Sequence, residues 1–305
     1  MNTLAALNDL ISDPSFRERV SEPITTAPQK ASLVPVPPGL HNDLKKALHS
    51  HGIDELFSHQ GQAVQAVLQG EDVIVSTGTG SGKSLCYLIP ALQASLTQPV
   101  ATTLILYPTK ALARDQLQKI ESYVDELGLR VGAYDGDTPK NQRGMIRRSA
   151  DLILTNPDML HVGILPNHEN WSRVLKNLNT IVLDELHVYR GAFGSHVAGV
   201  LKRLLRLCEW YGSKPRIIAS SATIANSAEL FTSLTGGEPT LITEDGAPKG
   251  KRTFLAIDAP VEGEGQSANV EAAHMLAGLV AEGVRTMAFC KSRVGTELVL
   301  RYAKD

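Results

Sequence analysis

The fold of this 305-residue chain is decided by the stretch Ser76-Thr77-Gly78-Thr79-Gly80-Ser81-Gly82-Lys83-Ser84. An apolar run, residues 73–75, precedes it, and the helix-compatible run 85–88 follows. A strand, a glycine-rich turn and a helix together surround a phosphate with backbone N–H groups and a helix N-terminus. Glycine allows positive φ and close approach of the backbone to the anion. The stretch therefore predicts a P-loop, which is a nucleotide-binding site.

The residues of this loop have different predicted roles in binding ATP and Mg²⁺. The backbone of residues 77–82 would surround the phosphates, Lys83 would reach the β- and γ-phosphates, and the Ser84 hydroxyl would bind Mg²⁺. The strict P-loop pattern has glycine where this chain has Thr77. An ordinary glycine-rich turn is the alternative, but a Gly-Lys-Ser sequence in register after an apolar strand favours the nucleotide site.

Composition narrows the class of protein. The net charge of −2 means that any nucleic-acid contact depends on a local groove rather than on a strongly basic surface. The sequence has no apolar run of the roughly 18–20 residues that a membrane span needs, and no secretory signal, so we expect no membrane partner. Cys86, Cys208 and Cys290 have no metal-binding spacing. Reduced thiols in a cytoplasmic protein are the expectation.

Short apolar runs that alternate with helical stretches predict an α/β fold with a parallel sheet buried on both faces. After the P-loop strand, these runs are 104–106, 129–134, 152–154, 181–183 and 217–219. Functional residues are then expected at the carboxyl ends of the strands.

Three segments are predicted along the chain. Residues 1–40 contain five prolines between positions 23 and 38 and are expected to form an arm or linker. Residues 41–245 would form the first domain, opening with a helix over 40–56. A polar, glycine-containing break follows, and 252–305 would begin a second α/β unit. The chain past the break is too short for a complete domain of ordinary size, so this unit is expected to be truncated.

An acidic pair follows one of these apolar strands, in the run Leu183-Asp184-Glu185-Leu186-His187. An aspartate there can hold the Mg²⁺ of the nucleotide, and a neighbouring glutamate can orient and deprotonate the attacking water. Acidic pairs after strands are often only solvated surface. The P-loop in the same predicted sheet favours catalysis by Asp184 and Glu185.

These motifs resemble those of the superfamily 2 DExH-box helicases. That family has alanine or threonine in place of the first P-loop glycine, as at Thr77, and its second motif is similar to 184–187. Further similar motifs occur in the family's order at 107–113 (Ia), 155–158 (Ib), 221–223 (III) and 289–293 (IV). Residues 184–208 are similar to the MrfA/YprA-type bacterial DNA-repair helicases, which are related to the RecQ group.

The resemblance implies a RecA-like fold and roles for several residues around ATP. Gln60 precedes Lys83 by 23 positions, and its amide can both donate to and accept from an adenine edge. His187 joins Asp184 and Glu185 in the catalytic set, with no suitably spaced partner for a metal-ligand role. The Ser221 and Thr223 hydroxyls would couple this set to the partner domain.

Nucleic-acid contacts are implied for Thr109 and Lys110, for Thr155 and Asn156, and for Ser292 and Arg293. The first two pairs follow apolar runs, so their backbone N–H groups and side chains can face a phosphate. A plain helix cap is the alternative for both pairs. Arg143, Arg147 and Arg148 either extend this basic track or form a solvated charged face.

The sequence therefore predicts an ATP-dependent DNA helicase of the superfamily 2 type, stepping along single-stranded or partly duplex DNA, 3′ to 5′ by resemblance, in DNA repair. The later motifs of the second domain, which supply arginines to the γ-phosphate, do not occur in this sequence. An arginine finger contributes about 10³–10⁵ in rate, so weak ATPase activity is expected of this chain alone. Two alternatives stay open: an RNA-remodelling ATPase, and a module that binds nucleotide or nucleic acid without turnover.

Overall fold

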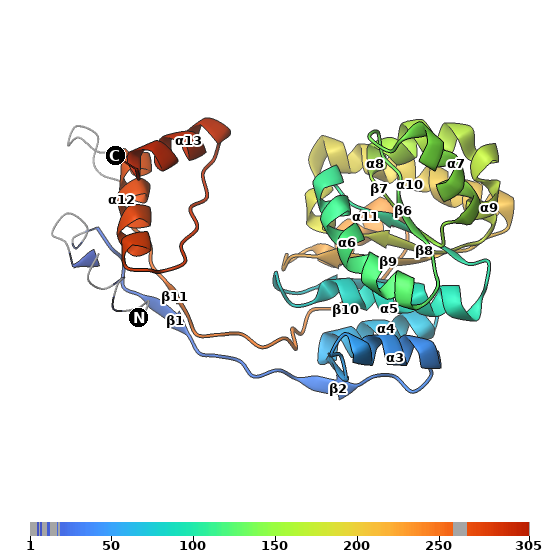
Figure 1. The fold of residues 1–305 in the computed structure, drawn as a ribbon, viewed down its shortest axis with the longest axis horizontal. Helices are drawn as coiled ribbons and strands as arrows, with labels where there is room; N and C mark the ends of the chain where they lie inside the picture. Colours follow the sequence, from blue (N-terminus) through green and yellow to red (C-terminus); the bar gives the residue numbers. More distant parts are fainter. Residues whose placement is uncertain are drawn as a thin grey trace. The chain divides into compact units, whose positions relative to one another are not determined.

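A computed structural model describes residues 19–258 and 267–304, and in the first eighteen positions only residues 5, 7, 11, 12 and 17. The chain divides into two compact units, each of which is described here by itself (Figure 1). The larger unit is Gln29–Lys249, and the smaller combines Met1–Pro28 with Gly250–Asp305. Residues 29–40, which the sequence analysis placed in an arm, thus lie in the larger unit.

A seven-stranded parallel sheet forms the centre of the larger unit. In spatial order its strands are β10 (Thr240–Ile242), β4 (Val73–Ser76), β9 (Arg216–Ser221), β8 (Leu178–Leu183), β5 (Thr102–Leu106), β7 (Leu152–Thr155) and β6 (Val131–Ala133). This is the RecA-like P-loop fold that the sequence predicts. Strand β10 lies beyond the apolar runs identified in the sequence.

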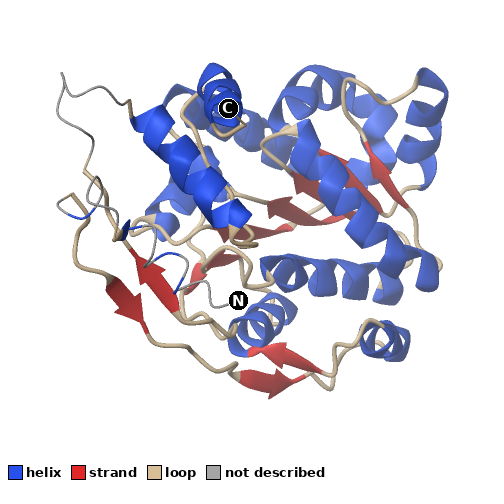
Figure 2. Cartoon of the chain, turned by 60° about the vertical axis from the view of Figure 1, so that its left-hand side comes forward, coloured by secondary structure: helices blue, strands red, loops and turns tan. Residues whose placement is uncertain are grey.

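Side chains alternate between the two faces of this sheet, as the period of a strand requires. Leu104 and Leu106 pack on one face and Ile105 on the other. Helices therefore cover both faces, and Figure 2 shows them, in blue, on either side of the red strands. This burial explains why the strands read as continuous apolar runs rather than alternating ones.

The first face is covered by the segments that share a core cluster with Leu104 and Leu106. These segments are α7 (Lys140–Ser149), α8 (Pro157–Met159), η1 (Leu160–Ile164), η2 (Leu165–Trp171), α9 (Ser172–Lys176), η3 (Leu186–Val188), α10 (Gly191–Tyr211) and α11 (Ser227–Thr235). The second face is covered by α3 (Asn42–Ser50), α4 (Ser58–Leu68), α5 (Lys83–Thr97) and α6 (Lys110–Glu126).

The chain before α4 differs from the expected single helix over 40–56. Helix α3 ends at Ser50, and β3 (Glu55–Phe57) pairs antiparallel with β2 (Leu33–Pro35). The proline-rich segment supplies this second strand, with Pro35 at its end where a missing N–H is tolerated. Strand pairing that brings together residues 33 and 57 is a tertiary contact, and helical periodicity alone does not reveal it.

The smaller unit contains β1 (Ile24–Thr26), which pairs antiparallel with β11 (Arg252–Phe254), and the helices α12 (Ala268–Ala281) and α13 (Arg293–Tyr302). The apolar run 287–289 forms no strand, and Phe289 is 89% exposed. Among the described residues of 250–304, only Ala273 and Val299 are buried apolar side chains. The described part of this unit therefore has little core of its own.

Candidate active site

The P-loop runs from the end of β4 at Ser76 to the start of α5 at Lys83. Gly80 and Gly82 have φ of 78° and 80°, a conformation that side chains with a Cβ rarely adopt. The Lys83 ammonium donates to the carbonyl oxygens of Thr77 (3.1 Å) and Gly78 (2.8 Å). The lysine side chain is thus folded back onto the loop from which the phosphate contacts are predicted.

Gln60 supports this loop from α4. Its Nε2 donates to the Gly82 carbonyl oxygen at 2.9 Å, and its Oε1 accepts from the Phe57 N–H at 2.9 Å. A Cβ added at Gly82 would lie 2.5 Å from that Nε2, and together with the φ of 80° this favours glycine. Both ends of the amide are engaged within the protein, so its contact with adenine remains a prediction.

His59 also contacts the loop, and the sequence analysis missed it. The side chain is fully buried; its Nε2 lies 3.0 Å from the Ser81 carbonyl oxygen, and its Nδ1 accepts from the Gly246 N–H at 3.2 Å. Burial lowers the pKa of His59 below its ordinary value. These contacts require a neutral ring with its proton on Nε2. The only available signal was its place beside Gln60.

Asp184 and Glu185 follow β8 directly, two strands away from the P-loop strand in the sheet. The Ser220 hydroxyl and the Glu185 N–H both donate to Asp184 Oδ1. Burial raises the pKa of Asp184, and the Lys83 charge acts in the opposite direction, so the two side chains belong to one electrostatic site. Ser220, another residue that the sequence analysis missed, positions the carboxylate.

Glu185 has φ 51° and ψ 47°, and it is the only non-glycine residue in the described part of the chain with positive φ. Such a conformation costs of order 1–3 kcal/mol and persists only where the surroundings impose it. The Glu185 Oε2 lies 3.3 Å from Nδ1 of His187. The strained backbone therefore directs the glutamate toward the third residue of the predicted catalytic set.

His187 links this set to the end of β9. Its Nδ1 accepts from the Ala222 N–H at 3.2 Å, and the Ala222 carbonyl oxygen accepts from the Ser76 hydroxyl at 3.1 Å. The sequence analysis assigned the coupling to the hydroxyls of Ser221 and Thr223. Within the larger unit, the described link runs through the Ala222 backbone. Among the described residues the buried Ser221 hydroxyl has no hydrogen-bond partner, and Thr223 is exposed, so coupling to the partner domain through these hydroxyls stays a prediction.

The residues predicted for Mg²⁺ have the chemistry that this ion prefers. Ser84 offers a hydroxyl, which in this structure donates to Gln116 Oε1 at 3.3 Å, and Asp184 offers a buried carboxylate. Mg²⁺ is bound by oxygen ligands, usually one or two carboxylates together with water and phosphate. Among the described residues, no group of three or more His, Cys, Asp or Glu side chains could hold a metal ion by itself.

The side chains of the larger unit that are predicted to contact nucleic acid cap helices or form buried hydrogen bonds. Thr109 and Asn156 are the N-caps of α6 and α8, accepting from the N–H groups of Leu112 and Met159. The buried Thr155 hydroxyl donates to the Tyr134 carbonyl oxygen at 2.6 Å. These contacts agree with the helix-cap alternative, and they leave nucleic-acid contact by these side chains as a prediction.

The basic residues near these caps have partners as well. The Lys110 ammonium lies 3.1 Å from Asp137, and it lowers the pKa of that carboxyl. Arg143 donates to the carbonyl oxygens of Thr138 and Asp135, so it stabilises this loop, and its part in a basic track stays a prediction.

The last predicted pair lies in the smaller unit. Ser292 is the N-cap of α13, accepting from the Gly295 N–H at 3.1 Å, and Arg293 is exposed at the first position of that helix.

The sequence profile of the DEAD/DEAH box helicases matches residues 57–231. The chain belongs to this family. It is 41% identical over 98% of its length to the uncharacterised ATP-dependent helicase YprA of Bacillus subtilis, and covers 41% of that protein. It is also 41% identical over 83% of its length to the ATP-dependent helicase HRQ1 of Saccharomyces cerevisiae, and covers 24% of it. The chain thus spans about two fifths or less of these relatives.

Together with the match to YprA, solved structures show that the chain is a superfamily 2 helicase of the MrfA/YprA type. The crystal structure of the DUF1998 helicase MrfA bound to DNA matches with a TM-score of 0.91 and 42% identity, over 98% of this chain and 43% of that one. The structure of MrfA bound to DNA and AMPPNP matches equally well, with a TM-score of 0.91. No described helix of the present chain is long and apolar enough to cross a membrane.

Proposed function

We propose that this chain is the ATP-binding part of a DNA helicase, which couples ATP hydrolysis to movement along single-stranded or partly duplex DNA. The observation that carries the proposal is the contact chain from His187 through the Ala222 backbone to Ser76. It joins the predicted catalytic residues to the strand that leads into the P-loop. A catalytic end and a phosphate-binding end that are linked by two hydrogen bonds suit hydrolysis coupled to conformational change.

Each residue of the site has a role in this proposal. Lys83 now donates to two carbonyl oxygens of its own loop, and it would exchange them for the β- and γ-phosphates when ATP binds. Ser84 and Asp184 would hold Mg²⁺, which neutralises charge on the phosphates when bound. Glu185 would take the proton of the attacking water, and His187 lies beside it, with Nδ1 3.3 Å from the Glu185 Oε2.

DNA is favoured over RNA as the partner. The two matches with TM-scores of 0.91, at 42% and 41% identity, are both structures of MrfA bound to DNA. The structure of Mss116 bound to ssRNA has a TM-score of 0.57 at 18% identity, which shows only a shared fold.

Movement from 3′ to 5′, a role in DNA repair and residence in the cytoplasm complete the proposal, supported by the resemblance and by three cysteines without disulfide partners. We also propose that residues 252–305 begin a second RecA-like domain. The described part of that segment holds a strand and two helices but little buried core. ATPase activity of this chain alone is therefore expected to be weak.

The test is the ATPase rate of the 305-residue chain and of a full-length relative of the YprA type, each with no nucleic acid, with single-stranded DNA and with RNA. Stimulation by DNA that is much stronger in the longer protein is expected. A larger stimulation by RNA would favour the RNA-remodelling class. Binding of both ligands by both proteins, with no turnover in either, would establish a binding module instead.

A further inference from the structure

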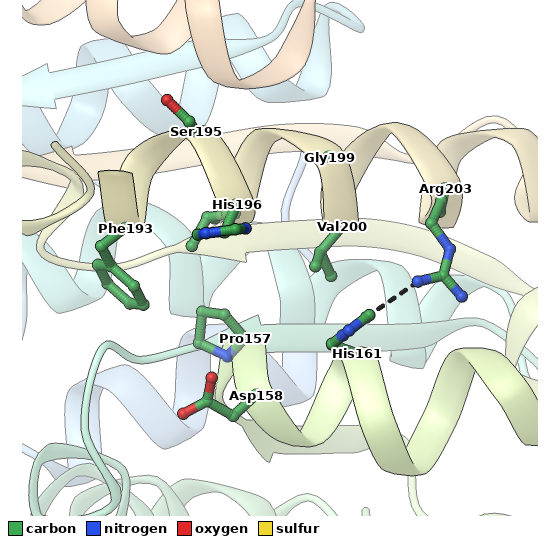
Figure 3. A pocket seen from close by; sticks show the side chains of 10 residues that line it. Pro157, Asp158, His161, Phe193, Ser195, His196, Gly199, Val200 and Arg203 are labelled. Atoms are coloured by element: carbon green, nitrogen blue, oxygen red, sulfur yellow. Dashed lines mark hydrogen bonds between the residues drawn. The ribbon is translucent and has the colours of Figure 1, made fainter. Parts of the chain in front are cut away.

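A cavity of about 450 Å³ lies beside the predicted nucleic-acid residues, and none of the roles assigned above uses it. Its size falls in the range of small-ligand sites, roughly 300–1,000 Å³. The side chains that line it come from two segments that face each other in Figure 3. They include Pro157, Asp158 and His161 from α8 and η1, and Phe193, His196 and Arg203 from α10.

The place of this cavity in the fold points to nucleic acid. Pro157 and Asp158 come directly after β7 and Asn156, and Phe193 lies in the first turn of α10, shortly after β8 and Glu185. The cavity is thus lined by segments that follow the carboxyl ends of β7 and β8, two strands of the seven-stranded sheet. In open parallel sheets, ligands bind in the crevice outside these ends.

The chemistry of the lining suits a flat ring with a polar edge. Phe193 is 37% exposed, and together with Pro157 it offers an apolar wall. Arg203 donates to His161 Nδ1 at 2.9 Å, so a neutral His161 carries its proton on Nε2 and can donate (Figure 3). The Asp158 carboxylate is an acceptor. A phosphate alone would not use the aromatic wall, and a purely apolar ligand would leave these polar groups unpaired.

The start of α10 is built so that this wall can form. A Cβ added at Gly194 would lie 2.5 Å from the Tyr189 carbonyl oxygen, so no other residue fits between them. This close approach brings the first turn of α10 against the preceding segment. The ring centroids of Phe193 and Tyr189 are 5.7 Å apart, and the two rings are tilted relative to each other. The Ser195 hydroxyl donates to the Gly191 carbonyl oxygen (3.2 Å), and His196 lines the cavity. The Gly194-Ser195-His196 sequence thus serves this site.

We propose that the cavity receives one unstacked base of a single strand, with the ring against Phe193 and its hydrogen-bonding edge toward Asp158 and His161. Stacking of this kind tolerates any base, because every base has a π-face. The proposal rests on the proposed function, since it requires that a single strand cross this edge of the sheet. It assigns to the chain a base contact in addition to contacts with the nucleic-acid backbone.

The test compares binding of two DNA strands to the full 305-residue chain by fluorescence anisotropy. One strand is oligo-dT, and the other has the same length and backbone but abasic residues throughout. For Phe193→Ala, oligo-dT binding is expected to weaken about 5-fold or more, as for loss of one stacked base, while binding of the abasic strand stays unchanged. Phe193→Leu, which keeps the apolar contact, is expected to lose less.

Trp210→Ala is the matched control. Trp210 lies on the same helix, is 80% exposed and does not line this cavity, so its loss should change neither affinity. Thermal unfolding of each variant checks that the fold is retained.

Equal losses for the two strands in Phe193→Ala, or no loss for either, would overturn the base site while leaving the helicase proposal in place. No binding of either strand by the unsubstituted chain would overturn both proposals.

Discussion

The carboxyl edge of the sheet has two halves that use their side chains differently. In the nucleotide half, at the ends of β4, β8 and β9, the functional groups are charged, buried or strained, as with the left-handed backbone of Glu185 and the raised pKa of Asp184. In the half predicted to contact nucleic acid, which is called the nucleic-acid half below, Thr109 and Asn156 follow β5 and β7 and cap helices. The nucleotide half keeps strained and buried charged groups, which lower stability but suit catalysis. The nucleic-acid half stabilises helix N-termini, whose backbone N–H groups can face the phosphates of a DNA strand.

The largest expected effect comes from Glu185→Gln in the nucleotide half. Loss of the general base should lower the DNA-stimulated ATPase rate by about 10²–10⁴-fold, with binding of ATP and of single-stranded DNA retained. Rates are to be measured beside Glu209→Gln, an exposed residue of α10, which should behave as the unsubstituted chain. Retention of full activity by Glu185→Gln would show that the nucleotide half does not use this residue as a general base.

His59 tests whether buried support of the P-loop is as important as its exposed residues. His59→Gln should lower the free energy of unfolding by about 1–3 kcal/mol, because the Ser81 carbonyl and the Gly246 N–H lose a buried partner. The KM for ATP should rise, whereas a purely structural role would leave it unchanged once the protein is folded. Urea denaturation and steady-state kinetics measure the two quantities.

The buried state of His59 is also expected to affect how the free energy of unfolding depends on pH. Burial lowers its pKa in the folded state, while the unfolded chain has the ordinary value of 6.5. Below that value the unfolded state binds the extra proton, so stability is lost as the pH falls, by at most about 1.4 kcal/mol per pH unit. The loss between pH 7.5 and 5.5 should shrink in His59→Gln. An equal loss of stability in the unsubstituted chain and in His59→Gln would show that other titratable groups cause it.

Asp184→Asn should change stability and activity in opposite directions in the nucleotide half. Burial raises the pKa of Asp184, so its ionised form destabilises the unliganded fold, increasingly as the pH rises from 3.8 toward the folded-state pKa. An asparagine Oδ1 still accepts from Ser220 and from the Glu185 N–H. At neutral pH the variant should melt about 2–4 °C higher and lose Mg²⁺-dependent ATPase activity. A lower melting temperature would contradict the account.

Asn156→Ala should give the smallest effect, in the nucleic-acid half. The α8 cap would be lost, which costs about 1 kcal/mol, and ATPase activity without DNA should be unchanged. Asn156→Asp keeps a cap but adds a negative charge near any phosphate, so it should weaken DNA binding more than it lowers stability. If both variants bound DNA normally, the caps would serve stability only.

Residues along single strands and turns were predictable from the sequence because their signals are local. The strand before the P-loop, the glycines with positive φ at positions 80 and 82, and the acidic pair after β8 follow from apolar runs and turn chemistry. Parallel strands place such residues at one edge, so their proximity was expected as well.

Only the tertiary structure decided which atoms meet at that edge. His59 on the P-loop, Ser220 on Asp184 and the Ala222 backbone on His187 join segments far apart in the chain, and no spacing reveals such pairs. The pairing of β2 with β3 is of the same kind. Sequence by itself determined the fold class, the nucleotide loop and the acidic residues, because those depend on local pattern. Packing of distant segments decided their hydrogen bonds, their pKa values and the cavity beside Phe193.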